Sequence, residues 1–175
     1  SNISIKEGQS FWLFNPFRLR KELNNLNELE DYEYNLDWNG NLKILINEKF
    51  PFMKWITEND EKLIDSEGKI LNYTNNINNL ETIDLYGKAA NTNIKTLKEN
   101  FLDKDFTKLK VKEIFFFQNI GWKIKFYNNK CVFFPLKKLE KTYDLFENIM
   151  NSQLYSEFNL FDMRIKNRVY MSKKC

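Results

Sequence analysis

The fold of the second half of this chain is decided by residues 121–150, which read GWKIKFYNNKCVFFPLKKLEKTYDLFENIM. Residues 121–126 alternate between apolar and polar side chains, a pattern typical of a half-buried strand. Asn128-Asn129 suits a two-residue turn because Asn tolerates positive φ, and a second strand is predicted at 130–134. Apolar residues then recur every three or four positions over 136–150, which predicts a helix with one side packed on the sheet.

Residues 158–174, FNLFDMRIKNRVYMSKK, predict a closing hairpin of two strands. We expect the last strand to cover residues 167–172, with no later element to pair on its outer side. An edge strand of this kind carries unpaired backbone donors and acceptors that can accept a strand from a partner protein.

The N-terminal part predicts the order strand, helix, strand, strand. Ile3 and Ile5 indicate a short strand, and Asn15-Pro16 provides a helix N-cap followed by Pro at the first helical position. The helix is expected to place three leucines on one face: Leu19, Leu23 and Leu26. Trp38-Asn39-Gly40 separates two alternating segments, 29–37 and 42–49, and predicts a β-hairpin because Asn-Gly favours the tight turn.

Further elements are predicted between this hairpin and residue 121. They are a shorter hairpin within 51–70, a polar loop at 72–79, a buried strand at 83–85, a helix at 91–102 with Ile94, Leu97 and Phe101 inward, and a strand beginning at 115–117. The elements together predict an α+β fold with a domain boundary near residue 55.

Composition limits the functional classes. The 175 residues are 42% hydrophobic and 16% aromatic, which is too apolar for a disordered chain. The net charge of +3 comes from scattered residues, so nucleic-acid binding gains little support. The chain has no His, which removes the commonest general base, the Ser-His and Cys-His nucleophile pairs and most zinc sites. We therefore expect a protein that is not an enzyme and has no cofactor.

Two cysteines and three acidic segments are given ordinary structural interpretations. Cys131 is interpreted as a small apolar side chain within a strand and Cys175 as an incidental tail residue, because two lone cysteines define no disulfide framework. The acidic segments 58–61, 65–68 and 103–105 are interpreted as solvated turns, since none has the ligand spacing of a calcium loop. No apolar run reaches the length of a membrane span, and no signal peptide begins the sequence.

Six motifs occur in an order and spacing that resemble one protein family. They are GQSFWLFNPFRLRKEL (8–23), ILINEKFPFMKW (44–55), KLIDSEGKI (62–70), LETIDLYG (80–87), GWKIKFYNNKCVFFPL (121–136) and FDMRIKNRVYM (161–171). The set resembles the bacterial cell division protein FtsQ, called DivIB in Gram-positive bacteria, and looks most like its alphaproteobacterial members.

The resemblance implies a POTRA domain of β-α-β-β order over residues 1–56, followed at 57–175 by a β domain of antiparallel strands with helices on one face. It also implies a non-catalytic divisome scaffold on the periplasmic side of the inner membrane at the division septum. The native protein would then be anchored by an N-terminal membrane span that is absent from this chain. An alternative is a POTRA-containing accessory of outer-membrane protein transport or assembly.

In similar proteins the partner FtsB, which travels with FtsL, adds a strand to the C-terminal sheet edge, and other division proteins are expected at the POTRA domain. The resemblance implies a partner surface formed by Arg164, Ile165, Asn167, Val169, Tyr170, Met171 and Ser172. Arg164 suits a bidentate contact with a partner carboxylate.

Simpler structural roles are also open for these segments. Phe161, Met163 and Ile165 alternate and are compatible with a core-facing row, with Arg164 and Lys166 as solvated charges on the other side. Near the first helix, four aromatic residues are expected to be core or staple contacts: Phe11, Trp12, Phe14 and Phe17. If some of them are exposed, a membrane-surface or division-partner contact becomes the better interpretation.

Overall fold

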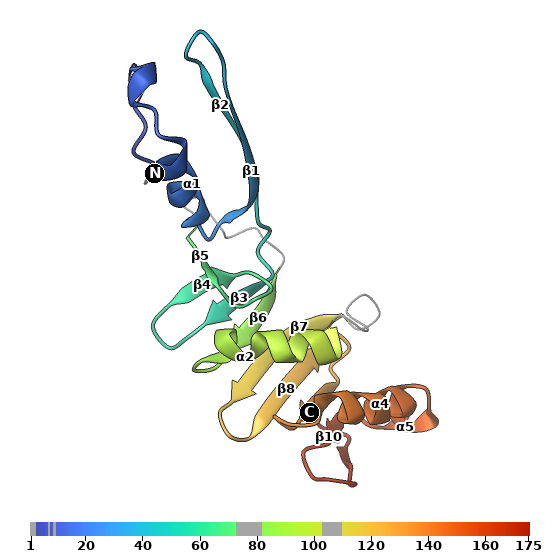
Figure 1. Ribbon diagram of the computed structural model, residues 1–175. Helices are drawn as coiled ribbons and strands as arrows, with labels where there is room; N and C mark the ends of the chain where they lie inside the picture. The colour runs from blue at the N-terminus through green and yellow to red at the C-terminus, as the bar shows by residue number, and fades with distance from the viewer. Residues whose placement is uncertain (1–2, 7, 9, 73–81, 103–109) are drawn as a thin grey trace. The chain divides into compact units, whose positions relative to one another are not determined.

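The computed structural model describes residues 3–6, 8, 10–72, 82–102 and 110–175 and confirms the α+β fold class (Figure 1). The chain forms two compact units. The first contains Ser1–Phe50 with Leu71–Asn75, and the second contains Pro51–Ile70 with Asn76–Cys175. Residues 51–56, expected in the first domain, belong to the second unit because strand β3 (Met53–Ile56) pairs within its sheet. Most of the predicted loop at 72–79 lies outside the described residues.

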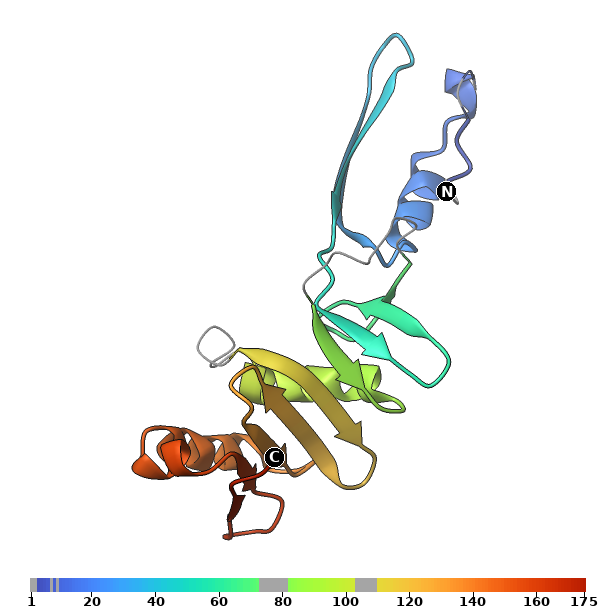
Figure 2. The same ribbon diagram turned by 180° about the vertical axis from the view of Figure 1, so that it is seen from behind.

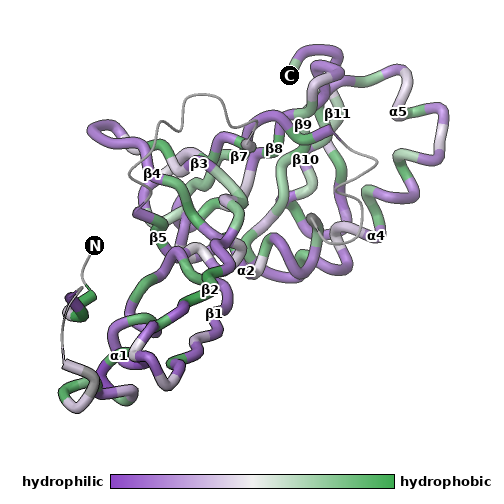
Figure 3. Tube along the Cα trace, turned by 90° about the horizontal axis from the view of Figure 1, so that it is seen from above, coloured by the Kyte–Doolittle hydropathy of each residue, from purple (hydrophilic) through white to green (hydrophobic). Residues whose placement is uncertain are grey.

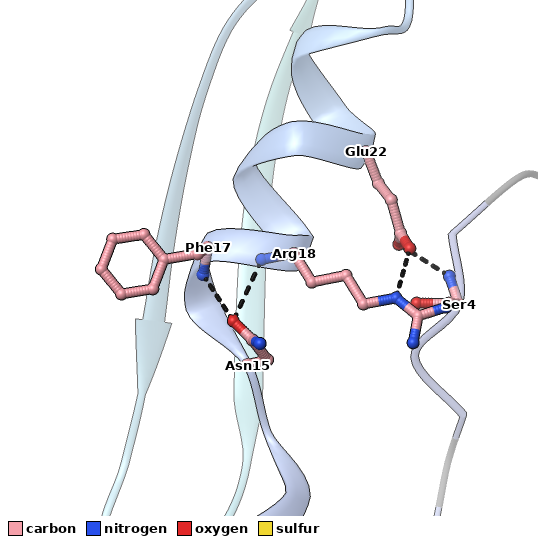
Figure 4. Close-up of polar contacts among 5 residues, drawn as sticks. All are labelled: Ser4, Asn15, Phe17, Arg18 and Glu22. Atoms are coloured by element: carbon pink, nitrogen blue, oxygen red, sulfur yellow. Dashed lines mark hydrogen bonds and ion pairs between the residues drawn. The ribbon is translucent and has the colours of Figure 1, made fainter.

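The helix of the first unit begins where the sequence predicts. A short 3₁₀ turn, η1 (Phe11–Leu13), precedes α1 (Pro16–Asn24). The side-chain oxygen of Asn15 accepts hydrogen bonds from the backbone N–H groups of Phe17 and Arg18 at 3.0 and 3.1 Å (Figure 4). This cap satisfies two donors that have no partner inside the helix. Two of the expected leucines, Leu19 and Leu23, are fully buried.

The hairpin of the first unit is also confirmed. Strands β1 (Leu29–Leu36) and β2 (Leu42–Glu48) pair antiparallel. Between them the Asp37 carboxylate accepts the N–H groups of Asn39 and Asn41 at 2.9 and 2.8 Å, while Gly40 takes a φ of +83°. The turn is therefore held by one side chain together with a left-handed conformation that Gly adopts without strain.

The strand predicted at Ile3 and Ile5 is wrong. Residues 3–6 form no regular secondary structure, and the N–H of Ser4 donates to the Glu22 carboxylate at 2.8 Å (Figure 4). The segment is therefore fixed to α1 by a side chain instead of pairing in a sheet. In the part of the first unit that is described, the expected β-α-β-β order lacks its first strand.

A nine-stranded sheet has the order β11-β10-β9-β8-β7-β6-β3-β4-β5, and all of its residues except Leu71, the last residue of β5, belong to the second unit. Its remaining strands are β4 (Glu61–Ile64), β5 (Ile70–Leu71), β6 (Ile83–Tyr86), β7 (Val111–Phe117), β8 (Gly121–Phe126), β9 (Cys131–Phe134), β10 (Leu160–Asp162) and β11 (Tyr170–Ser172). The expectation of a wholly antiparallel sheet is wrong, because β3 with β6, β6 with β7, and β9 with β10 run parallel. Helical crossovers separate β6 from β7 and β9 from β10, and such crossovers are what join parallel neighbours.

Helices cover one face of this sheet. They are α2 (Ala90–Leu97), the following π-helical turn η2 (Lys98–Leu102), α4 (Leu139–Met150) and the short α5 (Gln153–Glu157). The ring of Phe101 lies 5.1 Å from that of Phe134 in β9 and 5.5 Å from that of Tyr143 in α4, so η2 and α4 share the same face. Figure 2 shows the sheet from the side opposite α2, and Figure 3 shows apolar and polar segments alternating along its elements.

Phe146 of α4 lies at the centre of the core and is fully buried. Its ring contacts four aromatic rings at centroid distances between 5.7 and 6.3 Å: Phe126, Phe134, Tyr155 and Phe161. These rings come from β8, β9, α5 and β10. One side chain therefore joins the helical layer to the C-terminal strands of the sheet.

We predict that Phe146→Ala lowers the free energy of unfolding of the second unit by about 3–5 kcal/mol, because it removes a large buried ring and leaves a cavity. Leu145→Ala is the matched control: Leu145 is the preceding residue of the same helix and is 40% exposed. We expect this control to lose less than about 1 kcal/mol. Urea unfolding followed by tryptophan fluorescence measures both values, and equal losses would contradict the packing described above.

Candidate partner-binding edge

Strand β11 lies at one end of the nine-stranded sheet and pairs with β10. It is shorter than predicted, since it covers Tyr170–Ser172 and not residues 167–172. Asn167 lies in the turn that precedes it, with a φ of +60° that ends the extended backbone. The predicted position of Asn167 within the strand is therefore wrong, whereas Tyr170, Met171 and Ser172 do lie in the edge strand.

The parallel pairing of β10 with β9 fixes the direction of the β10 peptide groups. The N–H of Cys131 donates to the carbonyl of Asn159 at 2.7 Å, and the N–H of Met163 donates to the carbonyl of Phe133 at 3.0 Å. Successive residues of a strand direct their peptide groups to alternate sides. Between these two bonds, Phe161 therefore directs its N–H and carbonyl toward β9.

The same alternation defines the open edge. Leu160 and Asp162 direct their peptide groups toward β11, where they oppose Ser172 and Tyr170 in the antiparallel register. These two pairs consequently exchange the hydrogen bonds of the hairpin. Met171 lies between Tyr170 and Ser172, so its N–H and carbonyl point away from β10, toward the side on which a further strand would be added.

The side chains of β11 divide between the two faces of the sheet. Val169 and Met171 are partly buried and pack against the core, so they are oriented toward the helical layer. Tyr170 is 67% exposed and stands opposite Asp162 on the other face. The Ser172 hydroxyl accepts the N–H of Lys174 at 3.2 Å. Tyr170 is thus the exposed aromatic group nearest to the open edge.

Arg164 already has a carboxylate partner within the chain. Its guanidinium donates to both carboxylate oxygens of Asp162, at 2.8 and 2.5 Å, and lies 4.5 Å from the ring centroid of Phe133. The Arg164 hydrogen bond is the main cause of a lowered pKa of Asp162, and the same bond raises the pKa of Arg164. In this structure Arg164 closes the turn between β10 and β11, a contact that the sequence interpretation missed.

Ile165 does not continue the core-facing row suggested by its spacing. Phe161 and Met163 are buried, but β10 ends at Asp162 and Ile165 is 64% exposed in the following turn. A core role for Ile165 is therefore excluded, and its side chain is available at the end of the hairpin.

The edge is strongly basic. Residues 160–175 contain one acidic side chain, Asp162, and five cationic ones: Arg164, Lys166, Arg168, Lys173 and Lys174. The last four are exposed, and they lie on both sides of β11 along the chain. This arrangement favours an acidic partner segment.

The interpretation of Cys131 and Cys175 as unpaired residues is wrong, because the structure joins them in a disulfide bond. Cys131 is the first residue of β9 and is fully buried, whereas Cys175 follows β11 and is exposed. The pairing could not be predicted from the sequence because the two cysteines are 44 residues apart. They come together only because β10 and β11 return alongside β9.

Cations and aromatic rings alternate on the face of the sheet opposite the helices. Lys123 lies 5.3 Å from the ring centroid of Phe133, and Lys125 lies 4.8 Å from that of Phe115. Phe115 stacks on Tyr86 at 4.7 Å. Each of these rings has a neighbour at its face, so this surface is already occupied by contacts within the chain.

The aromatic cluster of the first unit is only partly a packing feature. Phe14 is half-buried and contacts the Tyr34 ring edge-on at 6.5 Å, which agrees with the expected role. Trp12 is 90% exposed and Phe17 is 79% exposed, so the expectation of core contacts is wrong for both. Figure 4 shows Phe17 directed away from α1, on the side opposite Arg18. The side chain of Phe11 lies outside the described residues.

Two of the acidic segments form turns with local partners. Asp60 pairs with Lys62 at 2.9 Å, and buried Asp65 accepts the N–H groups of Glu67 and Lys69 at 2.9 Å each. The third segment, 103–105, lies outside the described residues. Within the described ranges, no cluster of three or more His, Cys, Asp or Glu residues is placed to hold a metal ion.

Among the described residues, no helix has the length and apolar character needed to cross a membrane. No protein-family model matches this chain, and no curated protein matches it.

We predict that the pKa of the Asp162 carboxyl group lies below its ordinary value in the native protein and that Arg164→Gln raises this pKa back toward the ordinary value, because the variant removes the guanidinium hydrogen bond. Because the folded-state pKa is lowered, the stabilisation by this pair is present above the unfolded pKa and is lost as the pH falls through the folded pKa. Carboxyl ¹³C NMR measures the shift. Arg168→Gln removes another arginine of the same turn and should leave the Asp162 titration unchanged; an equal effect of both variants would refute the specific contact.

We also predict that reducing the disulfide lowers the free energy of unfolding by about 4 kcal/mol, the chain-entropy value for a loop of 44 residues. Urea unfolding with and without dithiothreitol measures the difference. Cys175→Ala should match the reduced protein and should not respond to dithiothreitol. Unchanged stability of the native protein on reduction would show that the bond does not restrain the unfolded chain.

Proposed function

We propose that this protein is the periplasmic part of a non-catalytic cell division scaffold of the FtsQ type, and that it binds a partner by accepting a strand at β11. The observation that carries the proposal is the open edge itself, where the N–H and carbonyl of Met171 point away from β10. The order of sequence motifs supports the choice of family. Strand addition needs no catalytic group, and the sequence without His fits a scaffold.

The edge favours one kind of partner segment. An extended segment would form hydrogen bonds with the Met171 peptide group, which sets its register along β11. Acidic side chains in that segment would meet Lys166 and Arg168 at one end of β11 and Lys173 and Lys174 at the other. A periplasmic segment of an FtsB-type protein, bound together with FtsL, is the partner that we propose.

The disulfide supports a location outside the reducing cytoplasm, because such bonds persist in oxidising compartments such as the periplasm. Anchoring at the inner membrane and recruitment to the septum follow from the family resemblance and are part of the proposal. Exposed Trp12 and Phe17 favour a second contact with another division protein at the first unit.

The proposal predicts that isothermal titration detects binding of a synthetic peptide from the C-terminal periplasmic segment of the FtsB encoded in the same genome. Two variants test the edge. Met171→Ala removes the side chain and keeps the N–H, whereas Met171→Pro removes both. We expect Met171→Pro to weaken binding at least tenfold relative to Met171→Ala, with both variants shown to be folded by circular dichroism.

Two results would contradict strand addition at β11. One is the absence of binding by the folded native protein. The other is equal affinity of the two Met171 variants, which would show that the peptide N–H plays no part. The affinity should also fall as salt rises, because four exposed cations flank the edge.

A further inference from the structure

We propose that the disulfide between Cys131 and Cys175 is a redox-controlled anchor of the docking edge, so that β11 is ordered for binding in the oxidised protein and loosened on reduction. This inference rests on the proposed function for its binding consequence. The anchoring of β11 is inferred from the contacts of β11 and does not depend on the proposed function.

β11 has few contacts of its own. It comprises three residues, and its partner β10 also comprises three. Of the three residues of β11, Met171 packs against the core, as does Val169 just before the strand, and both are partly exposed. Short edge strands with few buried contacts belong to the part of a protein that opens most readily. The order of β11 therefore depends on the contacts that hold its C-terminal end.

Two attachments hold that end. Asn159 donates its backbone N–H to the carbonyl of Ser172 at 2.9 Å and its side-chain amide to the carbonyl of Lys173 at 3.0 Å. The disulfide then joins Cys175 to Cys131 in β9, which is separated from β11 by β10. The covalent bond thus links the edge to the interior of the sheet, across the strand that β11 pairs with.

The bond lies on the face opposite the helices. Cys131 is two residues from Phe133, whose ring contacts Lys123 and Arg164 on that face, whereas Val132 between them is buried in the core. Breaking the bond therefore leaves the aromatic core under α4 in place. Its effect is expected at the tail and at β11.

The two cysteine residues differ in exposure. Cys131 is fully buried, and Cys175 is exposed. One thiolate of a dithiol reductant attacks the sulfur of Cys175, the protein S–S bond breaks, and its electron pair leaves on Cys131, which takes a proton. The second thiolate of the reductant then displaces Cys175 and closes a cyclic disulfide. Two electrons pass from the dithiol to the protein, which ends with two thiols.

Reduction would weaken binding because it would lower the order of β11. A partner that adds to a fixed edge forms its hydrogen bonds without ordering β11, whereas a loosened strand must be ordered first. The Met171 peptide group would then be presented in many orientations. Oxidation would restore the single orientation found in this structure.

The first test is backbone ¹⁵N relaxation of the whole chain, oxidised and after dithiothreitol. We expect the order parameters of Tyr170 and Met171 to fall from about 0.85 to below about 0.6 on reduction, while that of Ile124 in β8 stays near 0.85. Cys175→Ala should show the low values in both conditions and no response to dithiothreitol. Unchanged order at β11 in the reduced protein would overturn the anchor.

The second test repeats the titration with the FtsB-type peptide on the same samples. We expect reduction to weaken its binding at least tenfold and Cys175→Ala to bind equally weakly with or without reductant. Equal affinity of oxidised and reduced native protein would overturn the redox control. If the oxidised protein does not bind the peptide, the proposed partner fails, and the relaxation data still decide whether the disulfide orders β11.

Discussion

The parallel pairing of β10 with β9 is the interaction on which the C-terminal part of the second unit depends. It is made possible by the crossover through α4 and α5, which packs on the sheet around Phe146. The N–H and carbonyl of Phe161 in β10 point toward β9, so those of Leu160 and Asp162 point toward β11. In β11, the N–H and carbonyl of Met171 consequently point away from β10, toward the open side of the sheet. The orientation of the open edge is therefore determined by the pairing of β10 with β9 inside the sheet.

Sequence reasoning succeeded where local chemistry determines structure. Asn15 followed by Pro16 predicted the start of α1, and Asn39-Gly40 predicted the turn between β1 and β2, because each motif acts through its own backbone. The apolar spacing of α4 predicted its buried side for the same reason. The position of an open edge at the end of the chain also followed from the order of elements.

The failures all depend on contacts between distant residues or on segments too short to carry a pattern. A strand of three residues, such as β10, gives no periodic signal for its direction, so the parallel pairing was missed. Ile3 and Ile5 offered the spacing of a strand, but the Glu22 carboxylate provided a competing partner for the backbone. The disulfide could not be predicted from the sequence, because Cys131 in β9 and Cys175 come together only in the folded sheet. Asp162 could have been recognised as a partner for Arg164 from its place two residues earlier, at the end of a strand.

The division of the chain into units has a consequence for how the units can be separated. Residues 51–70 form part of the second unit, although residues on both sides, up to Phe50 and from Leu71, belong to the first. They are thus an insertion within the first unit, and the N–H of Asn72 reaches the Glu28 carboxylate at 2.7 Å only after the chain has returned from it. The first unit cannot be released whole by one cut after Phe50.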